Sequence, residues 1–167
     1  KVPTLGRLWA TGQSGSLRTL ATRGMKFSYW TYVVGLLGSS LLLPVLLTMT
    51  GKGMNFPSPM LVALFGIGGL VERFGAMHLQ IYSLTNHIVW HTANGISGLL
   101  FILIAVLLVP YLGVYGFAIA LVFANIGFYS WYSAKKSYQV LRSGFFQFDR
   151  KIILLPATVM LIYFCCA

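Results

Sequence analysis

The sequence predicts an all-α fold: a polytopic helical membrane protein with four full transmembrane helices and a partial fifth. Its apolar runs are long, and the clearest of them covers residues 96–109. A helix needs roughly 20 mostly apolar residues to cross about 30 Å of hydrocarbon. In addition, 57% of the residues are hydrophobic and only 8% are charged, whereas a soluble domain carries about 25% charged residues. Finally, basic segments precede and follow the apolar runs.

Residues 1–27 are predicted to form a basic amphipathic segment on the cytoplasmic membrane surface. The stretch from Gly12 to Gly15 divides it into two short helices. Apolar side chains such as Leu17 and Leu20 would enter the headgroup layer, while the basic side chains face anionic lipid. These are Arg7, Arg18, Arg23 and Lys26.

Residues 28–134 are predicted to hold the four membrane-spanning helices. Pro44 lies inside the first and should kink it. The second begins at Pro57 or Pro59, because proline suits a first helical turn. The turn from Pro110 to Gly113 reverses the chain between the third and fourth. The expected limits are about residues 29–50, 57–82, 87–110 and 114–133.

Residues 135–151 are predicted to be a basic cytoplasmic linker, and residues 152–167 to begin a further transmembrane helix. All lysines and arginines except Lys52 and Arg73 lie before the first span or after the fourth. Four crossings bring both basic segments to one side, which the positive-inside rule assigns to the cytoplasm. The predicted location is therefore the cytoplasmic (inner) membrane, with multiple passes.

The net charge of +10 points to the lipid bilayer as the partner. Cationic residues beside membrane spans meet anionic lipid. No basic stripe is interleaved with exposed aromatic residues, so we expect no nucleic acid. The chain begins with Lys1 and ends within or just after an apolar stretch. We therefore expect it to be a fragment of a longer transporter.

Two charged residues, Glu72 and Arg73, lie within the second span. An isolated charge in mid-bilayer costs roughly 2.5–3.5 kcal/mol, so such groups usually face an interior cavity and are functional. A cation such as Arg73 suits a phosphate-bearing ligand. The alternative is that Arg73 extends to the cytoplasmic headgroups and Glu72 pairs with a lysine elsewhere.

The third span carries a polar stripe. His87, His91, Asn94 and Gly98 recur at helical spacing, within about 60° of one another on a helical wheel, so this face should look inward. His78 could join them across the linker. Two histidines four residues apart can begin a metal site, but zinc needs three or four ligands. The favoured role is contact with a substrate or with a proton, and we expect no metal.

The fourth span repeats small residues at Gly116, Ala120 and Ala124, which predicts close helix packing. Asn125 beside them is placed to bond to another helix. Glycines at positions 66, 68 and 69 lie inside an apolar helix, so they indicate packing and not a nucleotide site. The sequence contains no nucleophile–base pair or paired carboxylates. We therefore expect no catalytic residues and no cofactor.

Three stretches together resemble the polysaccharide flippases of the multidrug/oligosaccharidyl-lipid/polysaccharide exporter superfamily, the O-antigen (Wzx-type) group. One is KVPTLGRLWATGQSGSLRTL, which is similar to the family's cytoplasmic connection between the second and third helices of a lobe. Another is Pro44 late in a span, followed by a short loop and a new span. The third is VPYLGVYGFAIALVFANI, which resembles the family's turn between the fifth and sixth helices.

The resemblance implies that the four spans are helices three to six of one MATE-like lobe. It also implies that the protein flips a lipid-linked oligosaccharide, attached to polyprenyl pyrophosphate, for surface polysaccharide synthesis. Two lobes would alternate access around a cationic cavity. The roles of Arg73 and Glu72 rest on the physical argument alone and not on the resemblance. Arg73 would contact the pyrophosphate or an acidic sugar. Glu72 would couple to a proton or sodium gradient, and the sugar path would be lined by His87, His91 and Asn94.

Three other functions stay open. One is an assembly subunit with no transport path, which would have a fully packed interior without a polar cavity. A drug or metabolite cation antiporter of the same superfamily would have a cavity with aromatic residues, one acidic residue and no cation. A membrane-embedded enzyme would place further histidines or carboxylates near His87 and His91.

Overall fold

The computed structural model describes residues 2–49, 56–87 and 89–166, and in these ranges it consists of helices joined by short turns, with no strand. Four helices are long and apolar enough to cross a membrane. The chain is therefore an all-α polytopic membrane protein, as predicted. The four helices are α2 (Ser14–Met49), α3 (Pro59–Tyr82, extended by the short helix η1, Ser83–Thr85), α4 (Trp90–Leu112), and a continuous helix formed by α5 (Val114–Ala124), the π-helical turn η2 (Asn125–Tyr129) and α6 (Ser130–Leu141).

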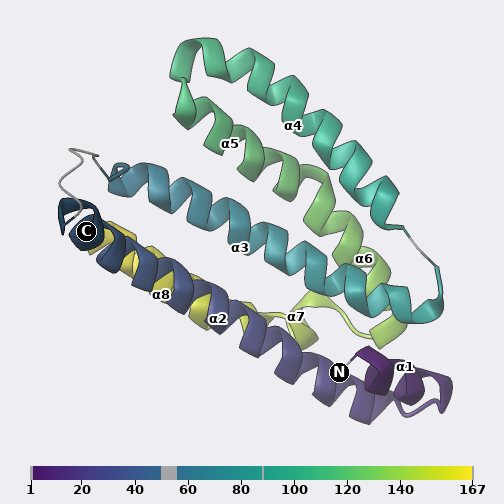
Figure 1. Cartoon of the computed structure of the whole chain (residues 1–167). Coiled ribbons are helices and arrows are strands. Elements are labelled where there is room, and N and C mark those ends of the chain that lie inside the picture. The colour runs from purple at the N-terminus through teal and green to yellow at the C-terminus, as the bar shows by residue number, and fades with distance from the viewer. Residues whose placement is uncertain (1, 50–55, 88, 167) are drawn as a thin grey trace.

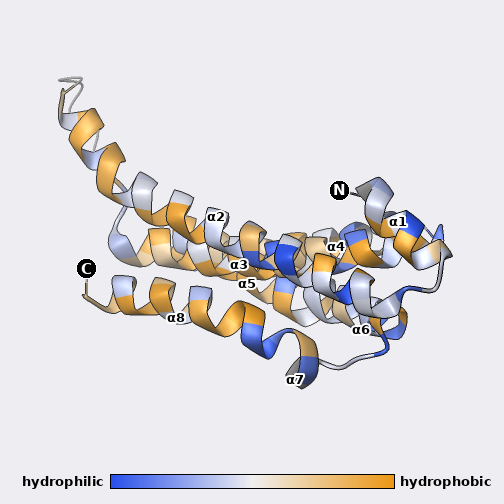
Figure 2. Ribbon diagram, turned by 90° about the horizontal axis from the view of Figure 1, so that it is seen from below, coloured by the Kyte–Doolittle hydropathy of each residue, from blue (hydrophilic) through white to orange (hydrophobic). Residues whose placement is uncertain are grey.

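Helix α3 lies at the centre of the arrangement (Figure 1). One side of α3 packs against α2, and the other packs against α5, η2 and α6. Helix α4 covers α5 from outside, and α8 (Arg150–Cys166) lies along α2. The short helices α1 (Val2–Ala10) and α7 (Phe145–Phe148) sit at the end of the bundle where α6 finishes. Hydrophilic segments gather at this end (Figure 2), which we call the basic end.

The first basic segment differs from its prediction. A single 36-residue helix, α2, begins at Ser14 and continues through Pro44. At 1.5 Å per residue it is about 54 Å long, which exceeds the bilayer core. Only Gly12, with φ of 70°, interrupts the chain, because no residue between Ser14 and Met49 stops a helix. Leu17 is 1% exposed, so it packs in the protein core and not among headgroups.

The third span also begins and ends later than predicted. Asn86 adopts a left-handed conformation with φ of 61°, so His87 precedes the helix and α4 starts at Trp90. At the other end α4 continues through Pro110, whose fixed φ is compatible with a helix. Gly113 alone makes the turn, with φ of 55°, and α5 follows at once.

The fourth spanning helix extends past its expected limit of about residue 133, into the segment predicted as a basic linker at 135–151. The fourth spanning helix continues to Leu141 and ends where Arg142 adopts φ of 47°. Its extension buries residues at helical spacing against the rest of the bundle. The buried residues are Ser133, Ala134, Ser137, Val140 and Leu141.

Close packing around α3 depends on its glycines. A Cβ atom at Gly69 would lie 2.2 Å from the hydroxyl of Tyr32, and one at Gly75 would lie 2.5 Å from the ring of Tyr129. This approach lets side chains of neighbouring helices reach α3 carbonyl groups. Tyr32 donates to the Gly66 carbonyl at 3.0 Å, and Asn125 donates to the Gly68 carbonyl at 3.3 Å, the interhelical bond expected for Asn125.

Removing one of these interhelical bonds should have a measurable cost. Ser130 donates its hydroxyl to the Val71 carbonyl at 2.7 Å. We expect Ser130→Ala to lower the free energy of unfolding in micelles by about 0.6 kcal/mol, and by no more than about 1.7 kcal/mol. Ser39→Ala is the matched control, because that hydroxyl bonds only within its own helix, to the Leu36 carbonyl at 2.8 Å. Equal effects of the two substitutions would contradict the role of the interhelical bond.

Candidate functional site

Two of the predicted site residues, Glu72 and Asn94, meet in one groove on the membrane-spanning part of the bundle. The groove has a volume of about 230 Å³ and lies between α3, α4 and the helix α5–η2. It is open to the outside of the bundle, and both predicted residues are exposed. Its lining residues are Glu72, Asn94, Ser97, Gly98, Phe101, Leu121, Ala124, Asn125 and Tyr129.

The local helix geometry produces this groove. Residues of η2 form a π-helical turn, a feature found frequently at functional sites. Within that turn Asn125 is anchored by its bond to the Gly68 carbonyl, and the Tyr129 ring packs over Gly75. On α4 the Ser97 hydroxyl donates to the Asn94 carbonyl at 3.3 Å, and both residues line the groove.

Arg73 is exposed but does not line the groove. Successive helical residues point about 100° apart, so Glu72 and Arg73 face different surroundings. Among the described residues, neither one forms an ion pair. The predicted pairing of Glu72 with a lysine is therefore not seen in this part of the chain.

The histidines do not form the predicted stripe. Because His87 precedes α4, its ring turns back toward η1, where Nδ1 lies 3.1 Å from the Thr85 carbonyl oxygen. Its ring centroid is 6.4 Å from that of Tyr82. His91 is exposed on the first turn of α4. Neither lines the groove, and the described residues contain no group of three or more His, Cys, Asp or Glu side chains suited to a metal.

His78 lies elsewhere, in a buried polar cluster that sequence reasoning missed. Its Nε2 is 3.3 Å from Oδ2 of Asp149, and its Nδ1 is 2.8 Å from the Ser137 hydroxyl. Tyr138 donates its hydroxyl to the same Asp149 oxygen at 2.5 Å. His78, Ser137 and Asp149 are each fully buried. The spacing of Ser133, Ser137 and Leu141 would have extended the buried face of the fourth span to Leu141, but it gave no signal for Asp149, which lies beyond the end of that helix.

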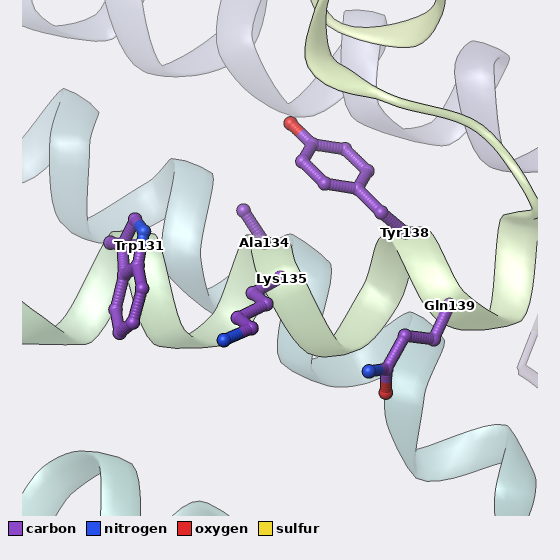
Figure 3. A pocket seen from close by; sticks show the side chains of 5 residues that line it. All are labelled: Trp131, Ala134, Lys135, Tyr138 and Gln139. Atoms are coloured by element: carbon purple, nitrogen blue, oxygen red, sulfur yellow. The ribbon is translucent and has the colours of Figure 1, made fainter.

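A second, shallower hollow lies on α6 near the basic end, with a volume of about 450 Å³ (Figure 3). In that view Tyr138 points away from Trp131 and Lys135, toward the other side of α6. The Lys135 ammonium lies 5.1 Å from the centroid of the Trp131 ring. A tryptophan and a lysine together are typical anchors at a membrane–water interface, so this hollow fits a lipid headgroup better than a transported molecule.

Comparison with protein-family models, with curated proteins and with solved structures finds no match to this chain.

Proposed function

We propose that this chain belongs to a flippase that moves a lipid-linked oligosaccharide across the membrane. The supporting observation is the composition of the groove, which combines amide, hydroxyl and carboxylate groups with two aromatic rings. Sugars present many hydroxyl groups, and asparagine both donates and accepts hydrogen bonds. Phe101 and Tyr129 offer apolar ring surfaces beside those polar groups. A ligand site of this kind needs such a mixture of apolar walls and a few polar groups.

The position of the groove supports transport. Polar groups within membrane spans usually face a cavity or a substrate pathway, because lipid does not solvate them. The four spans fit the resemblance to one lobe of a two-lobed transporter, in which the substrate binds between the lobes near the middle of the bilayer. In this proposal the groove faces the second lobe, and the sugar passes between the two.

Arg73 and the two exposed histidines extend the proposed path. Arg73 follows Glu72 on α3 and would contact the pyrophosphate, since a guanidinium binds phosphate oxygens with two parallel hydrogen bonds. His91 lies three residues before Asn94, toward the basic end of α4, and His87 lies beyond the start of that helix. They would meet the substrate as it enters from the basic end, which we place on the cytoplasmic side of the inner membrane.

A cation antiporter is the second candidate, and one observation favours it. The groove lining contains a single carboxylate, Glu72, and no lysine, arginine or histidine. Such a lining would also suit an amphiphilic organic cation. The enzyme alternative has no comparable support, because the structure places His78 in the core and the other histidines at separate surface positions.

Transport assays separate the two candidates. We expect the complete two-lobed protein, reconstituted in vesicles, to move a fluorescent polyprenyl-pyrophosphate oligosaccharide between leaflets. Glu72→Ala, Arg73→Ala and Asn94→Ala should each slow this movement by about tenfold or more, which corresponds to losing about 1.4 kcal/mol of hydrogen bonding. Thr92→Ala is the control, since Thr92 lies on α4 outside the groove.

Retention of transport by both charge variants at normal protein levels would show that the wrong residues are assigned. Movement of a cationic dye by the wild-type protein, without movement of the oligosaccharide lipid, would replace the flippase proposal with the antiporter. Failure to move either substrate would contradict both.

A further inference from the structure

The buried cluster at the basic end contains a histidine and an aspartate facing each other in the core. The ring of His78 on α3 lies between the carboxylate of Asp149, 3.3 Å from Nε2, and the hydroxyl of Ser137, 2.8 Å from Nδ1. Tyr138 donates to the same carboxylate oxygen. Oδ1 of Asp149 is buried with no hydrogen-bond partner in the described chain. This is an unusual setting for one of the two acidic residues of the protein.

Every neighbouring element contributes an aromatic ring to the walls. The Phe74 ring on α3 lies 4.5 Å from that of His78 between centroids, and the Tyr138 and Phe148 rings lie 5.2 Å and 6.4 Å away. On α2, Tyr29 is fully buried and its hydroxyl also has no hydrogen-bond partner among the described residues. The cluster is therefore enclosed by rings, and its titratable members are His78, Asp149, Tyr138 and Tyr29.

Arg18 packs on the Phe148 ring of the cluster, but its guanidinium bonds to a backbone carbonyl and not to Asp149. Arg18 on α2 lies over the Phe148 ring, 5.8 Å from its centroid, and donates to the Gln147 carbonyl at 3.2 Å. Arg150 and Lys151, which follow Asp149, are exposed. No basic side chain in the described ranges other than His78 forms an ion pair with the Asp149 carboxylate.

The charge balance of the pair favours a bound proton. With neutral His78, the Asp149 carboxylate is a single unbalanced charge in the protein interior, which is strongly unfavourable. One proton on the imidazole makes the pair neutral overall. Nδ1 is within hydrogen-bond distance of the Ser137 hydroxyl, and Nε2 lies 3.3 Å from Asp149 Oδ2 as an ion pair without a hydrogen bond, so the attraction between these two groups is that of opposite charges. The geometry thus suits the protonated state better than the unprotonated one.

The pair also joins two parts of the fold. Asp149 directly precedes α8, and its carbonyl accepts hydrogen bonds from the Ile152 and Ile153 amides at 2.8 and 2.9 Å. Its side chain contacts α3 through His78 and α6 through Tyr138. The start of α8 is therefore attached to the central helix through a group whose charge depends on one proton.

We propose that His78 and Asp149 form a proton-binding site, and that release of its proton is coupled to separation of the start of α8 from α3 and α6. The proton passes from water to the imidazole and returns to water when the cluster opens. Sequence reasoning gave the coupling role to Glu72, which is exposed in the groove, whereas His78 and Asp149 are fully buried. The inference goes beyond the proposed function and does not depend on the identity of the transported molecule.

The direction of the pH effect follows from linkage. The closed state binds the proton more tightly than an open, solvated state does, so raising the pH favours opening. Because one proton distinguishes the states, the closed-to-open ratio should change by at most about tenfold per pH unit. At pH values where both states are protonated, the ratio should be constant.

Two measurements on the wild-type protein test the proposal even if substitutions in the cluster prevent folding. The first is the nitrogen NMR spectrum of histidine-labelled protein from pH 5 to 9, assigned with His87→Gln and His91→Gln. The proposal requires an imidazolium in the closed state and a neutral imidazole once the start of α8 has separated. The second is hydrogen exchange of amides 148–153, expressed as protection factors that remove the intrinsic pH dependence of exchange. Protection should fall over the range in which His78 titrates, while amides of α4 and α5 keep theirs.

Variants then locate the effect. Asp149→Asn and His78→Gln should make protection at 148–153 independent of pH, whereas Glu72→Gln, which changes the other acidic residue, should leave the pH dependence intact. A neutral His78 from pH 5 to 9 in the wild-type protein would overturn the proposal. So would protection that does not follow the His78 titration, or protection that follows sodium concentration at fixed pH.

Discussion

Asp149→Ala should destabilise the protein by about 3–5 kcal/mol, the usual cost of removing one member of a buried charged pair. The substitution leaves Nε2 of His78 and the Tyr138 hydroxyl buried without the carboxylate that they face. Reversible unfolding in mixed micelles would measure the effect. Glu72→Ala removes the other acidic side chain, which is exposed and unpaired among the described residues, and should change stability by less than about 0.5 kcal/mol.

A double substitution separates pairing from packing. Replacing both members of a buried polar pair with apolar residues of similar size is often nearly neutral. We therefore expect the variant with both His78→Leu and Asp149→Leu to be more stable than Asp149→Ala alone. In the double variant the amide protection at residues 148–153 should no longer depend on pH. A double variant whose cost equals the sum of the single substitutions would show that the two side chains do not interact.

Gly116→Ala should destabilise the protein by about 1–3 kcal/mol, because the added methyl group has no space. A Cβ at this position would lie 2.6 Å from the Leu108 carbonyl oxygen and 2.9 Å from the Val109 nitrogen. Both are backbone atoms, so α4 and α5 would have to separate. The close packing predicted from the small residues of the fourth span is seen at Gly116, and Ala120 and Ala124 are buried as well.

The control for Gly116→Ala is a substitution that should raise the free energy of unfolding instead of lowering it. A Cβ added at Gly95 on α4 would meet no heavy atom of a neighbouring element within 4 Å. Gly95→Ala should therefore stabilise the helix by about 0.8–1.0 kcal/mol, the difference in helix propensity between the two residues. Unfolding measurements on both variants in the same micelles would test the pair. Equal destabilisation would mean that the α4–α5 contact is not as close as the structure shows.

The spanning helices could be predicted because the bilayer imposes a length and an apolar composition on each of them. Helix α3 has its predicted C-terminal limit, and it starts at one of the two prolines proposed, Pro59. Its start is further defined by Ser58, whose hydroxyl accepts from the Leu61 amide at 3.3 Å. The errors occurred where hydropathy gives no signal. α2 and α6 continue into polar sequence at the basic end, because their inner faces pack there against the protein.

The candidate site was predicted in part for a similar reason. Glu72 and Asn94 lie within helices and line one groove, where both side chains are exposed. The prediction that His87 lies on the polar face of the third span was wrong, because Asn86 adopts a left-handed conformation and His87 therefore precedes the helix. The His78–Asp149 pair joins two helices that are distant in the sequence, and local spacing carries no information about which helices will meet.

The most direct test of the groove as a water-accessible transport path is thiol labelling in intact membranes. Asn94→Cys and Ser97→Cys would be compared with Leu99→Cys, in a protein whose exposed Cys165 and Cys166 are replaced by alanine. Leu99 lies on the same helix but outside the groove, and it is 59% exposed. A charged, water-soluble thiol reagent should modify the groove cysteines and spare Leu99→Cys, and polyprenyl-pyrophosphate oligosaccharide should slow the modification. Equal reactivity at all three positions, or no reactivity at Asn94→Cys and Ser97→Cys, would contradict the account.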